Sequence, residues 1–195
     1  MCLNPRYLLC LLTWPKANIL IDNNGHAVLA DFSLITLIPD RSTFLSTCLS
    51  GGTFHWMSPE LLDPKRVGLD KPRVTRESDC YALGMAIYEV LCGCAPFGTG
   101  NSFVDLFGVL EGKRPERPQG ETGRLFTDGI WDVVERCWKP EPSERAKVED
   151  VLLVLQGEEA GVNDRLEAAA NDFCMFSTSI QALFLLFSSY NGIAE

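Results

Sequence analysis

The sequence is short of basic residues. Lysine and arginine together number 17 of its 195 residues, against 26 aspartates and glutamates, and the formal net charge is −9. Proteins that bind nucleic acid neutralise its phosphates with a patch of lysine and arginine side chains. No such basic patch is available in this sequence, so we expect no nucleic-acid partner.

The sequence also lacks a Cys-x-x-Cys pair, although it contains eight cysteines. Zinc clusters are usually built on such pairs, so we expect no structural zinc site. Several of the cysteines lie in apolar, helix-like stretches, where a thiol packs as a small hydrophobic group. Reduced thiols of this kind are typical of a cytoplasmic protein, which is the location that we expect.

Long apolar runs are scarce as well. The run from Tyr7 to Leu12 is short for a signal peptide, and no small-residue cleavage site follows it. The stretch from Phe173 to Ala194 carries no charge, but its content of Ser, Thr, Gln and Asn is high for a membrane span. We therefore expect a docking helix or a disordered tail there, with a membrane tether as the alternative.

The most informative stretch that is present runs from Asn18 to Asp31. Asn24-Gly25 is typical of a two-residue hairpin turn, which needs positive φ at both positions. The flanking runs 19–21 and 27–29 are short and apolar, as buried strands are. A hairpin would hold Asn18 and Asp31 at its open end, and their amide and carboxylate oxygens suit Mg²⁺ carrying phosphates. Alternatively, each residue caps a strand or a turn.

Three further motifs follow in order, namely Asp31-Phe32-Ser33, Gly52-Thr53 and Ser58-Pro59-Glu60. Together with Asn18, they resemble the second half of a protein kinase domain of the Ser/Thr or tyrosine-kinase-like type. In that family an Asn closes the catalytic loop, and Asp-Phe-Gly and Ala-Pro-Glu follow it. The resemblance implies that Asn18 and Asp31 hold Mg²⁺ on ATP, and that the segment ending at Glu60 receives a protein substrate. It places Thr53 beside the catalytic loop.

Two later positions match structural residues of the same family. Asp79, at the start of a long apolar stretch, resembles the Asp of the central helix that anchors the catalytic-loop backbone. Arg145 matches the arginine that forms a buried ion pair with the glutamate of Ala-Pro-Glu, here Glu60. Losing one partner would leave a buried charge uncompensated, so the presence of both favours the pair. The alternative is an exposed, unpaired Arg145.

The resemblance fails between Met1 and Pro15. The catalytic base Asp would fall five residues before Asn18, where Thr13 stands, and the loop lysine three residues before it, where Pro15 stands. A threonine cannot accept the proton of a substrate hydroxyl as a carboxylate does, so no catalytic residue is assigned. The glycine-rich loop, the strand lysine and its helix glutamate have no counterparts upstream. This pattern suggests a truncated or mis-joined N-terminus.

The expected fold is mainly α with a small β-hairpin (α+β), that is, a protein-kinase-like C-terminal lobe without the N-terminal β lobe. We expect an unmatched segment over 1–15, the large lobe over 16–156 and a helical or disordered tail over 157–195. The spacing of Phe103, Leu106, Phe107 and Leu110 predicts a helix with one buried face. Further helices are predicted over Pro59–Leu62, from Ser78-Asp79 to Leu91, from Thr127-Asp128, over Lys147–Leu155 and over Asp164–Asp172, with a surface loop over Lys113–Pro118.

Three functions compete at this point. The first is a protein kinase-like domain whose family activity is phosphoryl transfer from ATP to protein Ser/Thr, inactive in this chain because the small lobe, the catalytic Asp and the loop Lys are missing. The second is a pseudokinase remnant that binds a protein partner through its helical lobe. The third is a scaffold tethered to a membrane by its tail. ATP and Mg²⁺ are implied by the resemblance, with weak or absent binding expected in this chain.

Overall fold

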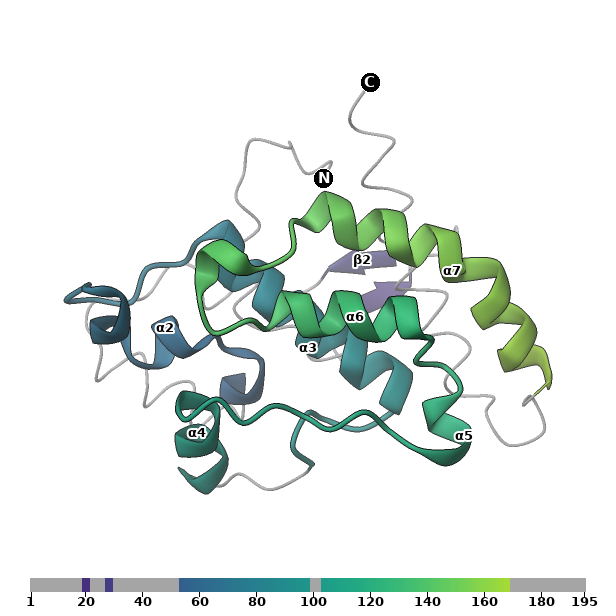
Figure 1. Ribbon diagram of the computed structural model, residues 1–195, viewed down its shortest axis with the longest axis horizontal. Helices are drawn as coiled ribbons and strands as arrows, with labels where there is room; N and C mark the ends of the chain where they lie inside the picture. Colours follow the sequence, from purple (N-terminus) through teal and green to yellow (C-terminus); the bar gives the residue numbers. More distant parts are fainter. Residues whose placement is uncertain (1–18, 22–26, 30–52, 99–102, 169–195) are drawn as a thin grey trace.

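The computed structural model describes residues 19–21, 27–29, 53–98 and 103–168. In these residues, helices gather around one long buried helix, α3 (Figure 1). Helices α6 and α7 pack in sequence on one side of α3, while η3, α2 and α4 form a second group. The elements are β1 (Ile19–Ile21), β2 (Ala27–Leu29), η3 (Thr53–Trp56), α2 (Pro59–Leu62), η4 (Pro64–Val67), α3 (Arg76–Cys92), α4 (Phe103–Leu110), α5 (Gly120–Gly123), α6 (Asp128–Cys137), η5 (Pro142–Glu144) and α7 (Val148–Ala168).

Helix α3 begins at Arg76, two residues before the predicted start at Ser78. Its N-cap is Thr75, whose Oγ1 accepts from the Ser78 backbone N–H at 3.2 Å. The Ser78 Oγ in turn accepts from the Thr75 N–H at 2.9 Å, so the two hydroxyl residues form a reciprocal capping box. Ser78 is therefore in the first turn of the helix, and the predicted start at Ser78-Asp79 was wrong. Every residue from Ser78 to Leu91 is buried, which makes α3 the centre of the core.

Helices α3 and α6 approach closely at a glycine. A Cβ built on Gly84 of α3 would lie 2.6 Å from the Cβ of Cys137 on α6, which is closer than side chains pack. Helix α6 starts at Asp128, in agreement with the predicted start at Thr127-Asp128. Its N-cap is Thr127, whose Oγ1 accepts from the Ile130 N–H at 3.1 Å. Its buried face faces α3 and is made of Ile130, Val133, Val134 and Cys137.

Helix α4 belongs to a second, smaller apolar cluster. Its buried residue is Val109, which packs with η3 and α2 residues Phe54, Met57, Leu61 and Leu62. The predicted buried face was wrong in part, because Phe107 is 60% exposed. Leu106 and Leu110 are partly buried against the cluster, and the side chain of Phe103 lies outside what the structure describes.

The two strands pair antiparallel, with Ile19 opposite Leu29, Leu20 opposite Val28 and Ile21 opposite Ala27. The predicted turn residues, Asn24-Gly25, lie outside the described residues. An unbroken ladder closed by a two-residue turn there would place Ile21 opposite Val28, one residue from the observed register. The turn type therefore stays a prediction.

Helix α7 is longer than predicted. The sequence indicated one helix ending at Leu155 and another over Asp164–Asp172, whereas α7 runs from Val148 to Ala168 without a break. It thus continues past residue 156, where we expected the lobe to end. Among the described helices, none has the length and apolar character needed to cross a membrane. The uncharged stretch 173–194 lies outside the described residues.

Candidate functional site

Asn18 and Asp31, which were predicted to hold Mg²⁺ and ATP, lie outside the described part of the chain. Thr13, which stands where the catalytic base would be expected, lies outside it as well. Thr53 is the first residue of η3, and its side chain is not described either. Within the described ranges, no group of three His, Cys, Asp or Glu side chains is placed to hold a metal ion. The predicted magnesium site therefore stays a prediction.

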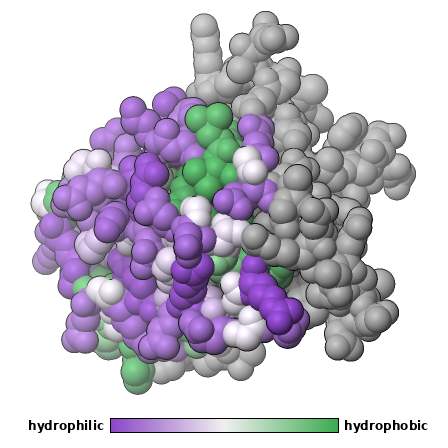
Figure 2. All heavy atoms as spheres, turned by 45° about the vertical axis from the view of Figure 1, so that its right-hand side comes forward, coloured by the Kyte–Doolittle hydropathy of each residue, from purple (hydrophilic) through white to green (hydrophobic). Residues whose placement is uncertain are grey.

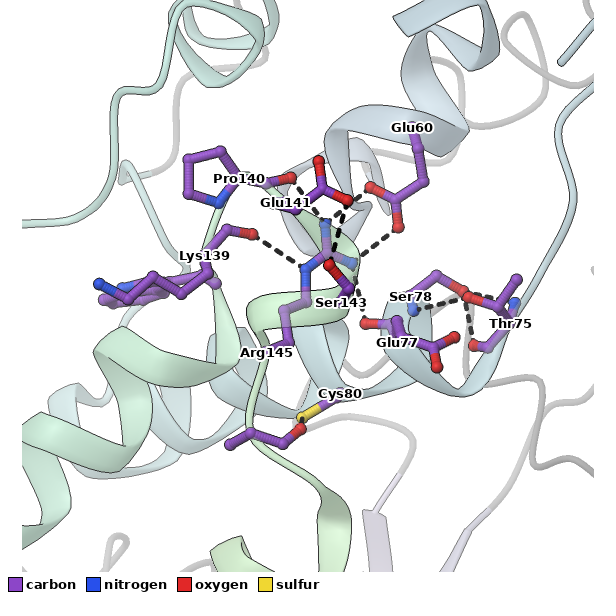
Figure 3. A network of polar contacts seen from close by, with 12 residues as sticks. Glu60, Thr75, Glu77, Ser78, Cys80, Lys139, Pro140, Glu141, Ser143 and Arg145 are labelled. Carbon is purple, nitrogen blue, oxygen red and sulfur yellow. Dashed lines mark hydrogen bonds and ion pairs between the residues drawn. The ribbon is translucent and has the colours of Figure 1, made fainter. Parts of the chain in front are cut away.

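The segment that follows Thr53 is described, and it is deeply buried. Residues 54–62 are all buried, from η3 through α2, and they pack against both α3 and α4. Ser58 is the N-terminal flank of α2, and Pro59 fills the first helical position, where the missing N–H costs no hydrogen bond. This local sequence sets Glu60 in the first turn, with its carboxylate directed at Arg145 (Figure 3).

Glu60 and Arg145 form the buried ion pair that the sequence led us to expect. The Arg145 Nη1 and Nη2 donate to the two carboxylate oxygens of Glu60, each at 2.7 Å, and both residues are only 7% exposed. This two-pronged geometry matches the planar guanidinium to the planar carboxylate. The pair joins α2 to the chain just after η5, across 85 positions of the sequence.

Backbone carbonyls accept the remaining donors of Arg145. Its Nε donates to the Lys139 carbonyl at 3.0 Å, and its Nη1 donates to the Glu77 carbonyl at 2.9 Å (Figure 3). A longer contact of 3.4 Å links Nη2 to the Pro140 carbonyl. The guanidinium thus ties α2, the first turn of α3 and the loop 139–145 into one unit, and its charge is compensated by Glu60.

Asp79 lies in the first turn of α3, two residues from Glu77, and is buried. Its backbone N–H donates to the Thr75 carbonyl at 3.1 Å. The catalytic-loop backbone that Asp79 was predicted to anchor lies outside the described residues. Its anchoring role therefore stays a prediction.

A second arginine, Arg114, shares an aromatic partner with Arg145. The guanidinium carbons of both arginines lie 5.2 Å from the ring centroid of Tyr81, which is fully buried in α3. Arg114 also donates from Nε to the Trp138 carbonyl at 3.0 Å and from Nη1 to the Val109 carbonyl at 3.1 Å. Burial raises the pKa of Tyr81 to about 12, although the two nearby arginines lower it. The phenol is therefore neutral at any physiological pH.

Arg114 was missed because the prolines around it indicated a solvated loop over Lys113–Pro118. Part of that loop is exposed, as predicted, but Arg114 is only partly exposed and bridges α4 to the residue that follows α6. Local sequence patterns could not reveal that Arg114 bridges these elements, because its partners Tyr81 and Trp138 lie 33 and 24 positions away in the sequence.

A hollow of about 350 Å³ lies beside the ion pair, between α2, η4, the end of α4 and residues 140–142. Its charged lining is mixed, with Arg66 and Arg114 opposed by Glu60, Glu111 and Glu141. Because the two signs nearly balance and the arginines already have partners, this lining favours no particular charged ligand.

The helical part around α3, with a buried carboxylate–guanidinium pair behind the segment 54–62, is like the C-terminal lobe of a protein kinase. The family model described as "Protein kinase domain" matches residues 16–154, and the chain belongs to this family. The match covers the described helices from η3 to η5 and the first residues of α7.

Similar proteins include several kinases of other organisms. "Serine/threonine-protein kinase mos" of Patiria pectinifera is 29% identical over 145 residues, which are 72% of this chain and 38% of that protein. "Dual specificity mitogen-activated protein kinase kinase hemipterous" of Drosophila melanogaster is 31% identical over 137 residues, 70% of this chain and 11% of that protein. "Receptor-interacting serine/threonine-protein kinase 3" of Rattus norvegicus is 27% identical over 166 residues, 80% of this chain and 32% of that protein. The chain thus spans well under half of each relative.

Proposed function

We propose that the chain forms the large-lobe part of a serine/threonine protein kinase domain, whose family activity is phosphoryl transfer from ATP to protein Ser/Thr. The observation that carries this proposal is the buried pair of Glu60 and Arg145. It fixes the segment 54–62 against α3, and the family receives its protein substrate on this segment. The names of the three relatives describe protein kinases, which supports a protein as the substrate class.

Asn18 and Asp31 are the residues that we propose to hold Mg²⁺ and ATP. Their amide and carboxylate oxygens are hard donors, which is the ligand chemistry that Mg²⁺ prefers. The strand register supports this proposal, because Ile19 follows Asn18 directly and pairs with Leu29, two residues before Asp31. When bound, Mg²⁺ neutralises phosphate charge during transfer.

We propose that this chain does not transfer phosphate itself, because two of its catalytic positions hold unsuitable residues. Thr13 stands where a carboxylate would accept the proton of the substrate hydroxyl, and Pro15 stands where a lysine would steady the phosphoryl group. Neither side chain can replace the missing group. The second candidate function is therefore a pseudokinase. It would keep the segment 54–62 fixed against α3 and bind a protein partner without transferring phosphate.

A transfer assay tests whether the chain is inactive, as both proposals require. The chain would be incubated with Mg²⁺ and ATP labelled in the γ-phosphate, together with a general Ser/Thr-containing protein substrate. We expect no label in the substrate. The control variant is Asp70→Ala, in the exposed loop before α3. Label that disappears in Asp31→Ala but remains in this control would show that the chain is an active kinase and contradict the proposal that it is inactive.

A further inference from the structure

Two cysteine side chains meet at the C-terminal end of α3. Cys92 is the last residue of the helix and is partly buried, and Cys94 is exposed two positions later. Their Sγ atoms are 3.2 Å apart. The arrangement depends on Gly93, which has φ 77° and ends α3 by donating its N–H to the Glu89 carbonyl at 2.8 Å. Because this left-handed conformation turns the chain sharply, the second sulfur comes back to the first.

The two sulfurs need to move little to become bonded. A disulfide joins sulfurs at about 2.05 Å, so a shift of about 1 Å in side chains at a helix end is sufficient. Exposure lets a small oxidant and a reductant reach Cys94 directly. The pair therefore combines short distance with access, which are the two requirements of a reversible thiol site.

A second pair of cysteines in the core provides an internal contrast. Cys80 and Cys137 are fully buried, with Sγ atoms 3.7 Å apart. The Cys80 thiol donates to the Ala146 carbonyl at 2.8 Å, and its hydrogen bond to Cys137, together with burial, raises the pKa of Cys137. The raised pKa keeps the Cys137 thiol protonated, and both thiols are buried away from solvent, so this pair is a poor target for an oxidant.

We propose that Cys92 and Cys94 are a modification site, at which hydrogen peroxide closes a reversible intramolecular disulfide. The Cys94 thiolate attacks one peroxide oxygen, the O–O bond breaks, and a sulfenic acid and one water result. The Cys92 sulfur then displaces hydroxide from the sulfenic sulfur, forming the S–S bond and a second water. In total, two thiols lose two electrons and two protons while one peroxide becomes two waters. A dithiol reductant reverses the reaction by exchange.

The surroundings connect this site to the core. Cys92 packs against the main apolar cluster, and the Tyr88 hydroxyl, one turn earlier, donates to the Glu116 carbonyl at 3.4 Å. The pKa of Tyr88 is raised, first by burial and then by the cysteine pair and Glu116. The Tyr88 ring in turn lies 5.6 Å from that of Phe126 and 6.2 Å from that of Trp138, measured between centroids. Oxidation of the cysteine pair would thus take place one turn from a tyrosine whose ring lies beside Phe126 and Trp138.

The test uses the full chain, reduced and then exposed to hydrogen peroxide. After the peroxide is removed, the remaining thiols are blocked with N-ethylmaleimide in denaturant, and the chain is analysed by mass spectrometry before and after digestion without reductant. We expect the loss of two blockable thiols and a disulfide between Cys92 and Cys94, both reversed by dithiothreitol. Cys92→Ser and Cys94→Ser should each abolish this disulfide.

Cys80→Ser is the matched control. Its hydroxyl can still donate to the Ala146 carbonyl, so the variant should fold and close the Cys92–Cys94 disulfide as the wild type does. The proposal is overturned if Cys94→Ser still loses two thiols, or if wild-type Cys94 proceeds to sulfinic acid while Cys92 remains blockable. Circular dichroism of each variant before oxidation verifies folding, and Cys94→Ser alone is sufficient if Cys92→Ser fails to fold.

Discussion

At the scale of single residues, Arg145 contributes most to the described site. It combines two charged hydrogen bonds to Glu60 with bonds to backbone carbonyls from two other segments. Desolvation makes a buried pair costly to form, so the pair adds less to stability than its short distances suggest. Its effect appears when one partner is removed, because the other charge then stays buried without compensation.

Arg145→Ala should therefore destabilise the chain by about 3–5 kcal/mol, measured by urea unfolding at neutral pH. The control Arg66→Ala removes an exposed guanidinium that lies 3.9 Å from Asp63, and it should change the free energy of unfolding by about 0.5 kcal/mol or less. Equal effects of the two substitutions would contradict the role assigned to the buried pair.

Tyr81 gives a second prediction at this scale, which concerns pH. Its pKa is raised from 10.0 to about 12, mainly by burial. A raised folded-state pKa means that above pH 10 the unfolded chain loses the phenol proton first, so the folded chain loses stability as the pH rises from 10 to 12. The hydroxyl has no hydrogen-bond partner among the described residues.

Tyr81→Phe removes the titrating group and keeps the ring between the two arginines. Its stability at pH 7 should change by less than about 1 kcal/mol, because no hydrogen bond is lost. Between pH 10 and 12, its melting temperature should fall less than that of the wild type. Parallel pH curves for the two proteins would show that burial of the Tyr81 phenol is not linked to folding.

At the scale of elements, the close approach of α3 and α6 depends on Gly84. A glycine within a helix costs about 1 kcal/mol relative to alanine, so its position needs a packing reason. The 2.6 Å that would separate an added Cβ from the Cys137 Cβ provides that reason. The sequence predicted both helices, but it could not show that Gly84 is the point of contact, because its partner Cys137 lies 53 positions away.

Gly84→Ala should destabilise the chain by about 1–3 kcal/mol through overpacking, despite its better helix propensity. Gly157→Ala in α7 is the matched control, because nothing lies within 4 Å of the added methyl group there. This second substitution should stabilise the chain by about 0.5–1 kcal/mol. Thermal unfolding of both variants measures the difference, and a stabilised Gly84→Ala would contradict the packing of α3 on α6.

Several element boundaries show where sequence patterns stop being informative. Thr75 and Ser78 can both cap a helix, and the structure uses both, which the apolar pattern after Ser78 could not reveal. In α4, Phe107 has the spacing of a buried residue, but the helix turns Val109 to the cluster of η3 and α2 instead. Such choices depend on the position of a distant partner and not on local periodicity.

At the scale of the whole molecule, the motifs in the sequence were sufficient to predict the protein kinase family. Glu60 and Arg145 could be predicted as partners because both match motif positions of a known lobe. Arg114 could not, because its contacts with Tyr81 and Trp138 follow from the packing of α3, α4 and α6. Figure 2 shows that most of the coloured surface on one face is hydrophilic, with one group of apolar side chains near its upper centre and smaller ones at the left and lower edge.

We propose that this kinase lobe binds Mg²⁺-ATP weakly and that the binding depends on Asp31 and Asn18. The most direct measurement is the melting temperature of the chain with and without Mg²⁺-ATP at about ten times a millimolar dissociation constant, where binding adds about 1.4 kcal/mol of stability. We predict an upward shift of a few degrees in the wild type and in Asp70→Ala, and none in Asp31→Ala. An unchanged wild-type melting temperature at saturating nucleotide, or an equal shift in Asp31→Ala, would contradict the account.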